Sequence, residues 1–389
     1  MSVFKIDFSI LYRNQNAVMN LSYWERTSWF SNIDFTIIGS GIVGLNCAIE
    51  LKAKHPKARI LILEKGKLPQ GASTKNAGFA CFGSISEILS DLKIHSEQEV
   101  VDLVKERYDG IHTLRHLLGD MAIGYQNYGG HELFLNKDLE LYERCLKELK
   151  SVNELLHSVF KADVFKTTPN TFNFKGINTN YISQIFEGQI DTGKMMTSLL
   201  QLAQQKGIII VNSTEVHSFK DSGAEVMVKT DDLEFTTKKL LIATNGFVSQ
   251  LLSENVKPAR AQVLITKPIK DLHVKGTFHL KEGYYYFRNI DNRILLGGGR
   301  NLDFKTEETA EFGTTSLVEN RIKELLRTVI LPEQHFEIDY SWSGIMGIGQ
   351  QKKPIVKQVS GNVACGVRLG GMGIAIGSTI GKKLANLFD

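Results

Sequence analysis

The sequence predicts an α/β protein in which a three-layer, Rossmann-like domain is interleaved with a second, α+β domain built on a mixed sheet. Two observations support this fold class. An apolar strand, a glycine-rich turn and a helix follow one another near the N-terminus, and a second apolar strand comes next. Segments of α/β character return twice further along the chain. With 389 residues, the chain has room for two domains of ordinary size.

The first strand and helix belong to a βαβ unit of about thirty residues. Residues 34–38 (DFTII) are a continuous apolar run, typical of a parallel strand that is buried on both faces. A glycine-rich turn separates this strand from a helix predicted over 45–54, and a second strand is predicted over 59–64. A short amphipathic helix predicted over 21–30 leads into the unit.

The rest of the chain alternates between helix and strand. Apolar residues at helical spacing predict helices over 96–118, 138–160, 192–205 and 317–331, and a last helix over 374–388. Apolar runs and alternation predict strands over 208–211, 215–219, 224–230, 233–236 and 239–243, and β structure over 260–299.

This order predicts two discontinuous domains after an N-terminal extension and lead-in helix at 1–30. The cofactor domain is expected to comprise residues 31–95, 188–259 and 335–389. The substrate domain is expected to comprise residues 96–187 and 260–334. Because Met19 opens a stretch typical of a domain start, residues 1–18 are expected to be either an extension or the result of a mis-set start codon.

Composition excludes several classes of function. The net charge is +4, from 46 basic and 42 acidic residues, and it indicates no nucleic-acid groove. The four cysteines are far apart and form no C-x-x-C pair, which favours a reducing cytoplasm over a disulfide framework or a zinc site. The longest uncharged apolar run, residues 369–381, is too short and too rich in glycine to span a bilayer.

The glycine-rich turn has the spacing of a dinucleotide cradle. Gly39 permits a tight turn, Gly41 lets the backbone approach a pyrophosphate, and Gly44 lets the helix pack closely on the strand. Glu64 stands at the end of the second strand, where an acid accepts a hydrogen bond from a ribose hydroxyl. A 2′-phosphate would require an arginine there, so this pattern predicts FAD or NAD and not NADP.

The loop that follows decides between them. Residues 65–78 (KGKLPQGASTKNAG) resemble the G-A-S-x-x-N-A-G loop of the D-amino acid oxidase-like flavoprotein superfamily. Three further stretches resemble the same family in the same order, at 188–216, 243–246 and 366–373. Among its subgroups, residues 284–299 look most like gamma-glutamylputrescine oxidase, with glycine oxidase and sarcosine oxidase more distant.

The resemblance implies that FAD binds in an extended pose, with its adenine end on the glycine-rich turn and its ring beside the loop that ends at residue 78. Members that attach the flavin covalently carry histidine near the position of Asn76 or cysteine near Trp342. This chain has neither, so we expect noncovalent FAD. The implied cofactor-binding residues are Gly39, Ser40, Gly41, Ile42, Val43, Gly44, Glu64, Lys65, Ala72, Ser73, Thr74, Asn76, Ala77, Gly78, Val216, Ala243, Thr244, Gly246, Gly344, Gly370, Gly371, Met372, Gly373 and Ile374.

A tyrosine-rich strand supplies the expected substrate residues. Alternation places Tyr284, Tyr286 and Arg288 on one face, and two phenols beside a guanidinium suit a bound carboxylate. The resemblance likewise implies a carboxylate-binding arginine at the position of Arg288. No metal site is expected: His112 and His116 have a metal-binding spacing on a helix but lack a third ligand nearby.

The expected activity is oxidation of a small primary or secondary amine, an amino acid or polyamine derivative, by hydride transfer to FAD. Dioxygen or another acceptor would then reoxidise the flavin. Two alternatives keep the flavin: oxidation of a 2-hydroxy acid, and an electron-relay subunit that docks on a partner. A third, an NAD-binding protein, would be colourless. Residues 350–353 (QQKK) depart from the aspartate that many members carry before the proline matching Pro354.

Overall fold

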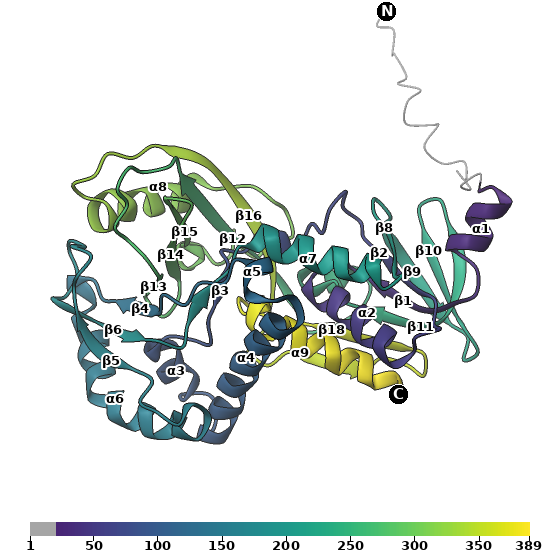
Figure 1. Ribbon diagram of the computed structural model, residues 1–389, viewed down its shortest axis with the longest axis horizontal. Helices are drawn as coiled ribbons and strands as arrows, with labels where there is room; N and C mark the ends of the chain where they lie inside the picture. The colour runs from purple at the N-terminus through teal and green to yellow at the C-terminus, as the bar shows by residue number, and fades with distance from the viewer. Residues whose placement is uncertain (1–20) are drawn as a thin grey trace, which may run out of the picture.

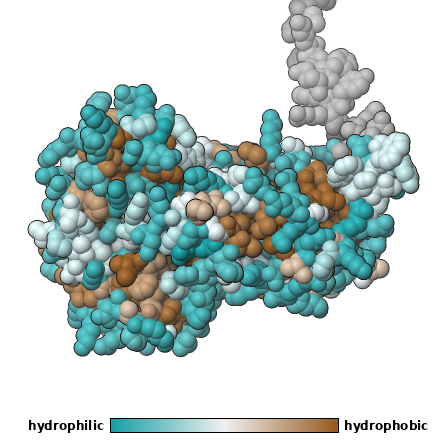
Figure 2. Space-filling view, in the orientation of Figure 1, coloured by the Kyte–Doolittle hydropathy of each residue, from teal (hydrophilic) through white to brown (hydrophobic). Residues whose placement is uncertain are grey.

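The computed structural model describes residues 21–389, so the expected extension at 1–18 lies outside the described residues. Two lobes stand side by side, each built on its own sheet (Figure 1). The face drawn in Figure 2 is mostly hydrophilic, with hydrophobic side chains in separate patches on both lobes. Within residues 21–389, no helix is long and apolar enough to cross a membrane.

The first lobe contains an eight-stranded sheet with the order β17-β18-β11-β1-β2-β8, to which the hairpin β9–β10 is added. Its central strand carries Ile37 in one core and Ile38 in another, which explains the uninterrupted apolar run. The strands are β1 (Ile33–Ile38), β2 (Ile60–Leu63), β8 (Ile209–Val211), β9 (Val216–Asp221), β10 (Val226–Thr230), β11 (Glu234–Ile242), β17 (Ile355–Gln358) and β18 (Val363–Val367).

Three helices pack beside this sheet: α2 (Ile42–Lys54), α7 (Thr192–Gln205) and α9 (Gly373–Ala385). The short helix α1 (Tyr23–Trp29) precedes it and begins with a capping box between Ser22 and Glu25.

The second lobe contains an eight-stranded mixed sheet with the order β16-β12-β15-β14-β13-β4-β6-β5. Its strands are β4 (Gly130–Leu133), β5 (Lys166–Pro169), β6 (Asn180–Gln184), β12 (Lys257–Thr266), β13 (Thr277–Leu280), β14 (Tyr285–Ile290), β15 (Arg293–Gly298) and β16 (Ile338–Ile348). Its helices are α3 (Ile85–Asp91), α6 (Leu139–Phe160) and α8 (Ser316–Leu325). The small antiparallel pair β3 (Phe79–Ala80) and β7 (Gly188–Gln189) links the two lobes.

One long helix, α4 (Glu97–Leu118), contributes to the cores of both lobes. Val100 and Val104 pack in the core of the second lobe, whereas Ile111 and Leu114 pack in the core of the first. A Cβ atom at Gly110 would lie 1.9 Å from the carbonyl oxygen of Ala375 in α9, so only glycine allows the two helices to approach so closely.

The structure corrects several expected element bounds. Residues 233–236 and 239–243 are not separate strands but lie largely in the single strand β11. The helix expected over 317–331 is α-helical only to Leu325 and then forms a π-helix, Leu326–Ile330. Helix α3 was not predicted, although Ser84 and Glu87 form the capping box that starts it.

The pairing of strand β16 also changes the expected residue at which the chain returns from the second lobe to the first. The expected cofactor domain includes residues 335–389, but β16 pairs with β12 along most of its length and so belongs to the second sheet. The return to the first lobe therefore comes after Ile348. The apolar stretch at 338–348 could not reveal this, because pairing with either sheet requires the same residue types.

Candidate functional site

A cavity of about 590 Å³ extends between the two lobes. Its lining includes Gly39 and Glu64, at the carboxyl ends of the parallel strands β1 and β2, and Tyr284 and Tyr286 of the second lobe. Strand β1 lies between β2 and β11, so the sheet order reverses at this point. Ligands of open α/β sheets bind at such a reversal.

The glycine-rich turn is built as a cradle. Gly39 has φ +101°, and a Cβ there would lie 2.9 Å from the carbonyl oxygen of Ala243. A Cβ at Gly44 would lie 1.9 Å from the carbonyl oxygen of Gly39, so α2 packs directly on the turn. Gly41 is the N-cap of α2 and lines the cavity. The backbone N–H groups and the helix dipole are thus placed to hold a pyrophosphate.

Hydrogen bonds fix the carboxylate of Glu64 at the edge of this cradle. Its carboxylate is 6% exposed, and one oxygen accepts hydrogen bonds from the backbone N–H and the hydroxyl of Ser40, both at 3.0 Å. The other oxygen accepts from the N–H of Gly66 at 3.0 Å. A fixed carboxylate that lines the cavity suits a ribose hydroxyl, so these residues fit the adenosine half of FAD.

The amide side chain of Asn76 makes four of the hydrogen bonds that hold the loop after Glu64. The Nδ2 of Asn76 donates to the carbonyl oxygens of Ala72 (3.2 Å) and Ser73 (2.8 Å). Its Oδ1 accepts from the N–H of Gly78 (2.9 Å) and the hydroxyl of Thr192 (2.8 Å). Asn76 thus fixes the loop wall against which a flavin ring would lie.

Replacing Asn76 by alanine is therefore expected to loosen this wall and to weaken FAD binding about tenfold, equivalent to about 1.4 kcal/mol. Asn76→Asp keeps the two acceptor contacts and loses the two donors, so it should fall between the wild type and Asn76→Ala. Equilibrium titration of the flavin-stripped protein with FAD measures the effect, and equal dissociation constants for all three proteins would contradict it.

Twenty of the 24 predicted cofactor residues line the cavity, and four do not. Ser40 lies behind and holds Glu64. Gly44 packs on Gly39, and the hydroxyl of Thr74 donates to the carbonyl oxygen of Pro69 at 2.6 Å. Gly246 packs on β16, because a Cβ there would lie 2.6 Å from the carbonyl oxygen of Met346. These four shape the site without facing it.

The predicted substrate residues separate into two groups. Tyr284 and Tyr286 line the cavity. Arg288 does not: it is 2% exposed, and its Nη1 donates to the carbonyl oxygen of Gly78 at 3.3 Å. Burial lowers the pKa of Arg288 to about 10. Its guanidinium therefore supports the flavin loop from behind, and a direct role with the substrate stays a prediction.

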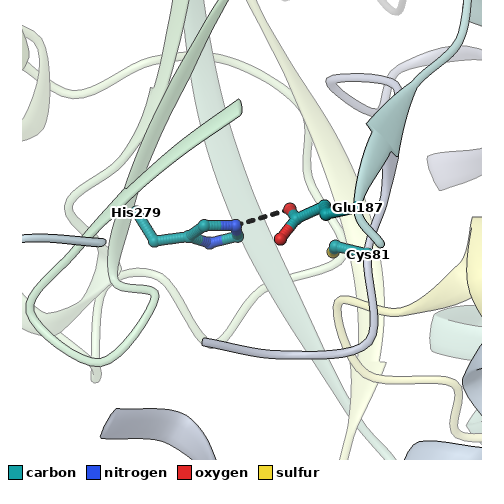
Figure 3. A group of neighbouring side chains, drawn as sticks. All are labelled: Cys81, Glu187 and His279. Carbon is teal, nitrogen blue, oxygen red and sulfur yellow. Dashed lines mark hydrogen bonds and ion pairs between the residues drawn. The ribbon is translucent and has the colours of Figure 1, made fainter. Parts of the chain in front are cut away.

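A buried cluster that the sequence did not predict borders the same cavity (Figure 3). The imidazole Nε2 of His279 lies 2.7 Å from Oε1 of Glu187, and Cys81 lies beside them. Glu87 approaches the other ring nitrogen at 4.0 Å. These residues come from β13, the segment before β7, the segment after β3, and α3. No spacing in the sequence links them, although His279 is paired with Tyr286 in the sheet.

The cluster has an unusual charge state. Burial lowers the pKa of His279, but the nearby carboxylates of Glu187 and Glu87 outweigh this and raise it to about 9. His279 is therefore an imidazolium near neutral pH. Burial also raises the pKa of Glu132 to about 7, and burial and the carboxylates raise that of Cys81 well above its usual value. An ion pair with a neutral thiol beside it accounts for these contacts.

Metal ligation is a weaker interpretation of the cluster. Ligand atoms of Cys81, Glu187 and His279 lie within 4.8 Å of one another, which is close enough for one ion. The hydrogen bond already occupies the imidazole nitrogen and the carboxylate oxygen that face each other. His112 and His116 lie exposed on α4, and within residues 21–389 neither joins a group of three potential ligands.

Residues 34–387 match the FAD dependent oxidoreductase family. The chain belongs to this family. It is therefore an FAD-dependent oxidoreductase, as the glycine-rich turn and the loop at 65–78 predicted.

Individual relatives are distant in sequence. The chain is 22% identical over 377 residues to "Probable oxidoreductase OrdL" of Haemophilus influenzae, covering 90% of this chain and 82% of that one. It is 24% identical over 326 residues to the glycine oxidase of Geobacillus kaustophilus, covering 80% of each. The crystal structure of the glycine oxidase of Bacillus cereus superposes with a TM-score of 0.74 at 17% identity, covering 92% of this chain and 94% of that one. This confirms the fold of the two lobes.

Proposed function

We propose that this FAD-dependent oxidoreductase oxidises a small primary or secondary amine, an amino acid or polyamine derivative. One observation carries the proposal: a single cavity runs from the dinucleotide cradle to a pocket bordered by Tyr284, Tyr286 and His279. Cofactor and substrate can therefore meet inside one enclosure. The likeness to glycine oxidases supports an amine as the substrate class.

The residues of the first lobe would hold FAD noncovalently. Glu64 would accept a hydrogen bond from a ribose hydroxyl, and the turn from Gly39 to Ile42 would bind the pyrophosphate. When bound, FAD accepts a hydride from the carbon that bears the amine. Gly373 starts α9 at the cavity, so its helix dipole favours negative charge at that end of the site.

The residues of the second lobe would orient the substrate. Tyr284 and Tyr286 border the cavity as hydroxyl-bearing rings, and burial raises the pKa of Tyr286 to about 12, so its phenol stays protonated and can donate. The carboxylate of Glu87 lines the same end and offers an acceptor to an N–H of the neutral substrate amine. Holding the substrate in one orientation is the main contribution that the protein makes to hydride transfer.

An anaerobic titration of the purified protein with a panel of amines, amino acids and 2-hydroxy acids tests the proposal. We expect amines to bleach the oxidised flavin band and air to restore it. Bleaching by 2-hydroxy acids alone would contradict amine oxidation and favour the hydroxy-acid alternative. A yellow protein that no compound of the panel bleaches would favour an electron-relay subunit, which should then copurify with a stoichiometric partner.

A further inference from the structure

Glu87 of α3 presents a carboxylate to the substrate end of the cavity. Its side chain is 14% exposed, and its Oε2 accepts a hydrogen bond from the backbone N–H of Ser84 at 3.0 Å. The same oxygen lies 4.0 Å from Nδ1 of His279. Within residues 21–389, no hydrogen bond or ion pair reaches Oε1. One oxygen of Glu87 is therefore fixed by the protein, and the other is free to bind a ligand.

The two neighbouring carboxylates differ from Glu87 because both of their oxygens are occupied. Glu187 uses one oxygen for Nε2 of His279 at 2.7 Å and the other for the side-chain amide of Gln184 at 2.6 Å. Ser86 donates its backbone N–H and its hydroxyl to the two oxygens of Glu132. Neither Glu187 nor Glu132 lines the cavity, so Glu87 is the member of this group that a substrate can reach.

Glu87 carries its negative charge near neutral pH. Burial raises its pKa, but the imidazolium of His279 and the N–H of Ser84 outweigh this effect and lower the pKa below its usual value. His279 does not neutralise Glu87 completely, because its shorter contact is to Glu187.

Two other cations of the cavity wall stand near Glu87 but are held elsewhere. Lys352 pairs with the buried carboxylate of Asp91, and Arg107 donates to the carbonyl oxygen of Phe82 at 2.8 Å. Among the described residues, neither of these cations forms an ion pair with Glu87. The free oxygen of Glu87 thus lacks a cation that the protein itself could supply.

The surroundings of Glu87 suit a bound ammonium group. A Cβ at Gly283 would lie 2.8 Å from the carboxylate of Glu87, so the turn that leads to Tyr284 runs directly past it. Phe79 also lines the cavity, and its ring packs edge-on against Tyr286 with the ring centroids 5.6 Å apart. Aromatic rings attract ammonium groups, and a carboxylate adds the opposite charge and a hydrogen-bond acceptor.

We propose that Glu87 binds a second, protonated amino group of the substrate, which is not the amine that is oxidised. This proposal rests on the proposed function, which it narrows to diamines and other amines that carry a further basic group. The amine that is oxidised has to be neutral, because its lone pair stabilises the positive charge that develops on the neighbouring carbon. Glu87 can accept an N–H from either nitrogen of such a substrate, and its charge favours the protonated one.

Titration of the FAD-loaded protein with tert-butylammonium tests the site without turnover, because the carbon beside its nitrogen has no hydrogen to lose. tert-Butanol is the neutral compound of the same shape. We expect Glu87→Gln to raise the calorimetric dissociation constant of tert-butylammonium by about tenfold or more, and to leave that of tert-butanol and the FAD content unchanged. Glutamine also forms capping boxes, so α3 should keep its start. Glu87→Asp should restore part of the affinity, because it returns the charge on a shorter side chain.

Glu282→Gln is the matched control, because Glu282 also lines the cavity but already pairs with Arg144 at 3.4 Å. It should bind tert-butylammonium like the wild type. Affinity that is lost in Glu282→Gln but kept in Glu87→Gln would overturn the assignment, as would a wild-type protein that does not bind tert-butylammonium.

Turnover separates a second amino group from the reacting one. Linear diamines and the monoamines of the same chain length are compared by kcat/KM, and Glu87→Gln should lower the value for diamines by about tenfold more than the value for monoamines. Equal losses for both would show that Glu87 acts on the reacting amine and would overturn the proposal. Failure of the proposed function looks different: no amine would bleach the flavin, while the dependence of tert-butylammonium binding on Glu87 would remain.

Discussion

Replacing Gly41 by glutamate is expected to abolish FAD retention while leaving the protein folded. Gly41 has φ −70° and ψ −177°, so its backbone accepts any residue. A Cβ there would lie 2.8 Å from the hydroxyl oxygen of Ser73, a side chain that can move. The added carboxylate would occupy the place of the pyrophosphate and repel it. We expect the FAD dissociation constant to rise by about a thousandfold or more, equivalent to about 4 kcal/mol.

The measurement is the ratio of flavin to protein absorbance after purification and after addition of FAD, with circular dichroism to verify folding. Gly361→Glu is the matched control, because nothing lies within 4 Å of a Cβ at that exposed glycine. It should retain FAD like the wild type. Full flavin occupancy in Gly41→Glu would remove this turn from the cofactor site.

Replacing His279 by glutamine is expected to lower the free energy of unfolding by about 3 to 5 kcal/mol near neutral pH, because it leaves a buried carboxylate without its cation. Glu187 is 1% exposed, and its second oxygen accepts a hydrogen bond from Gln184 at 2.6 Å. The amide can replace the hydrogen bond of His279 but not its charge. Asp339→Asn, which removes the charge from a partly exposed ion pair with Arg293, serves as the control and should cost no more than about 1 kcal/mol.

The same pair predicts a pH dependence with a definite sign. Because the pKa of His279 is raised to about 9 in the folded protein, the ion pair stabilises fully below the unfolded value of about 6.5. This stabilisation is lost as the pH rises through 9. We expect denaturant unfolding between pH 6 and pH 10 to show a difference in the free energy of unfolding between the wild type and His279→Gln. This difference should shrink as the pH rises from about 6.5 to about 9. A constant difference would show that the charge of His279 does not contribute.

The sequence predicts well which residues of the first lobe line the cavity, because the determinants of their position are local. A strand, a turn and a helix in succession fix where Gly39, Gly41 and Gly44 lie, whatever the rest of the chain does. The acid at the end of β2 follows from the same unit, because adjacent parallel strands end at the same edge of the sheet. These features therefore needed no knowledge of distant contacts.

The substrate half depends on sheet register and on long-range packing, which no spacing reveals. Alternation along β14 puts Tyr286 and Arg288 on one face, although Tyr284 lies in the turn before this strand. Alternation cannot show that Arg288 ends behind Gly78 while Arg300 reaches the cavity. His279 meets Glu187 only because β13 lies beside β4 and β14 in the second sheet. The predicted domain boundary at residue 335 is wrong for the same reason, because β16 pairs with β12, which lies much earlier in the chain.

The packing of helix α4 in both lobes affects the stability of the whole molecule. Its two ends are buried in different cores, and its middle is pressed against α9 at Gly110. Loss of packing in either lobe would therefore expose apolar side chains of this helix, which couples the stability of the two lobes. The same helix joins the lobe that carries the dinucleotide cradle to the lobe that carries Tyr284 and Tyr286. The separation of these two walls of the cavity therefore depends on side-chain packing along one helix.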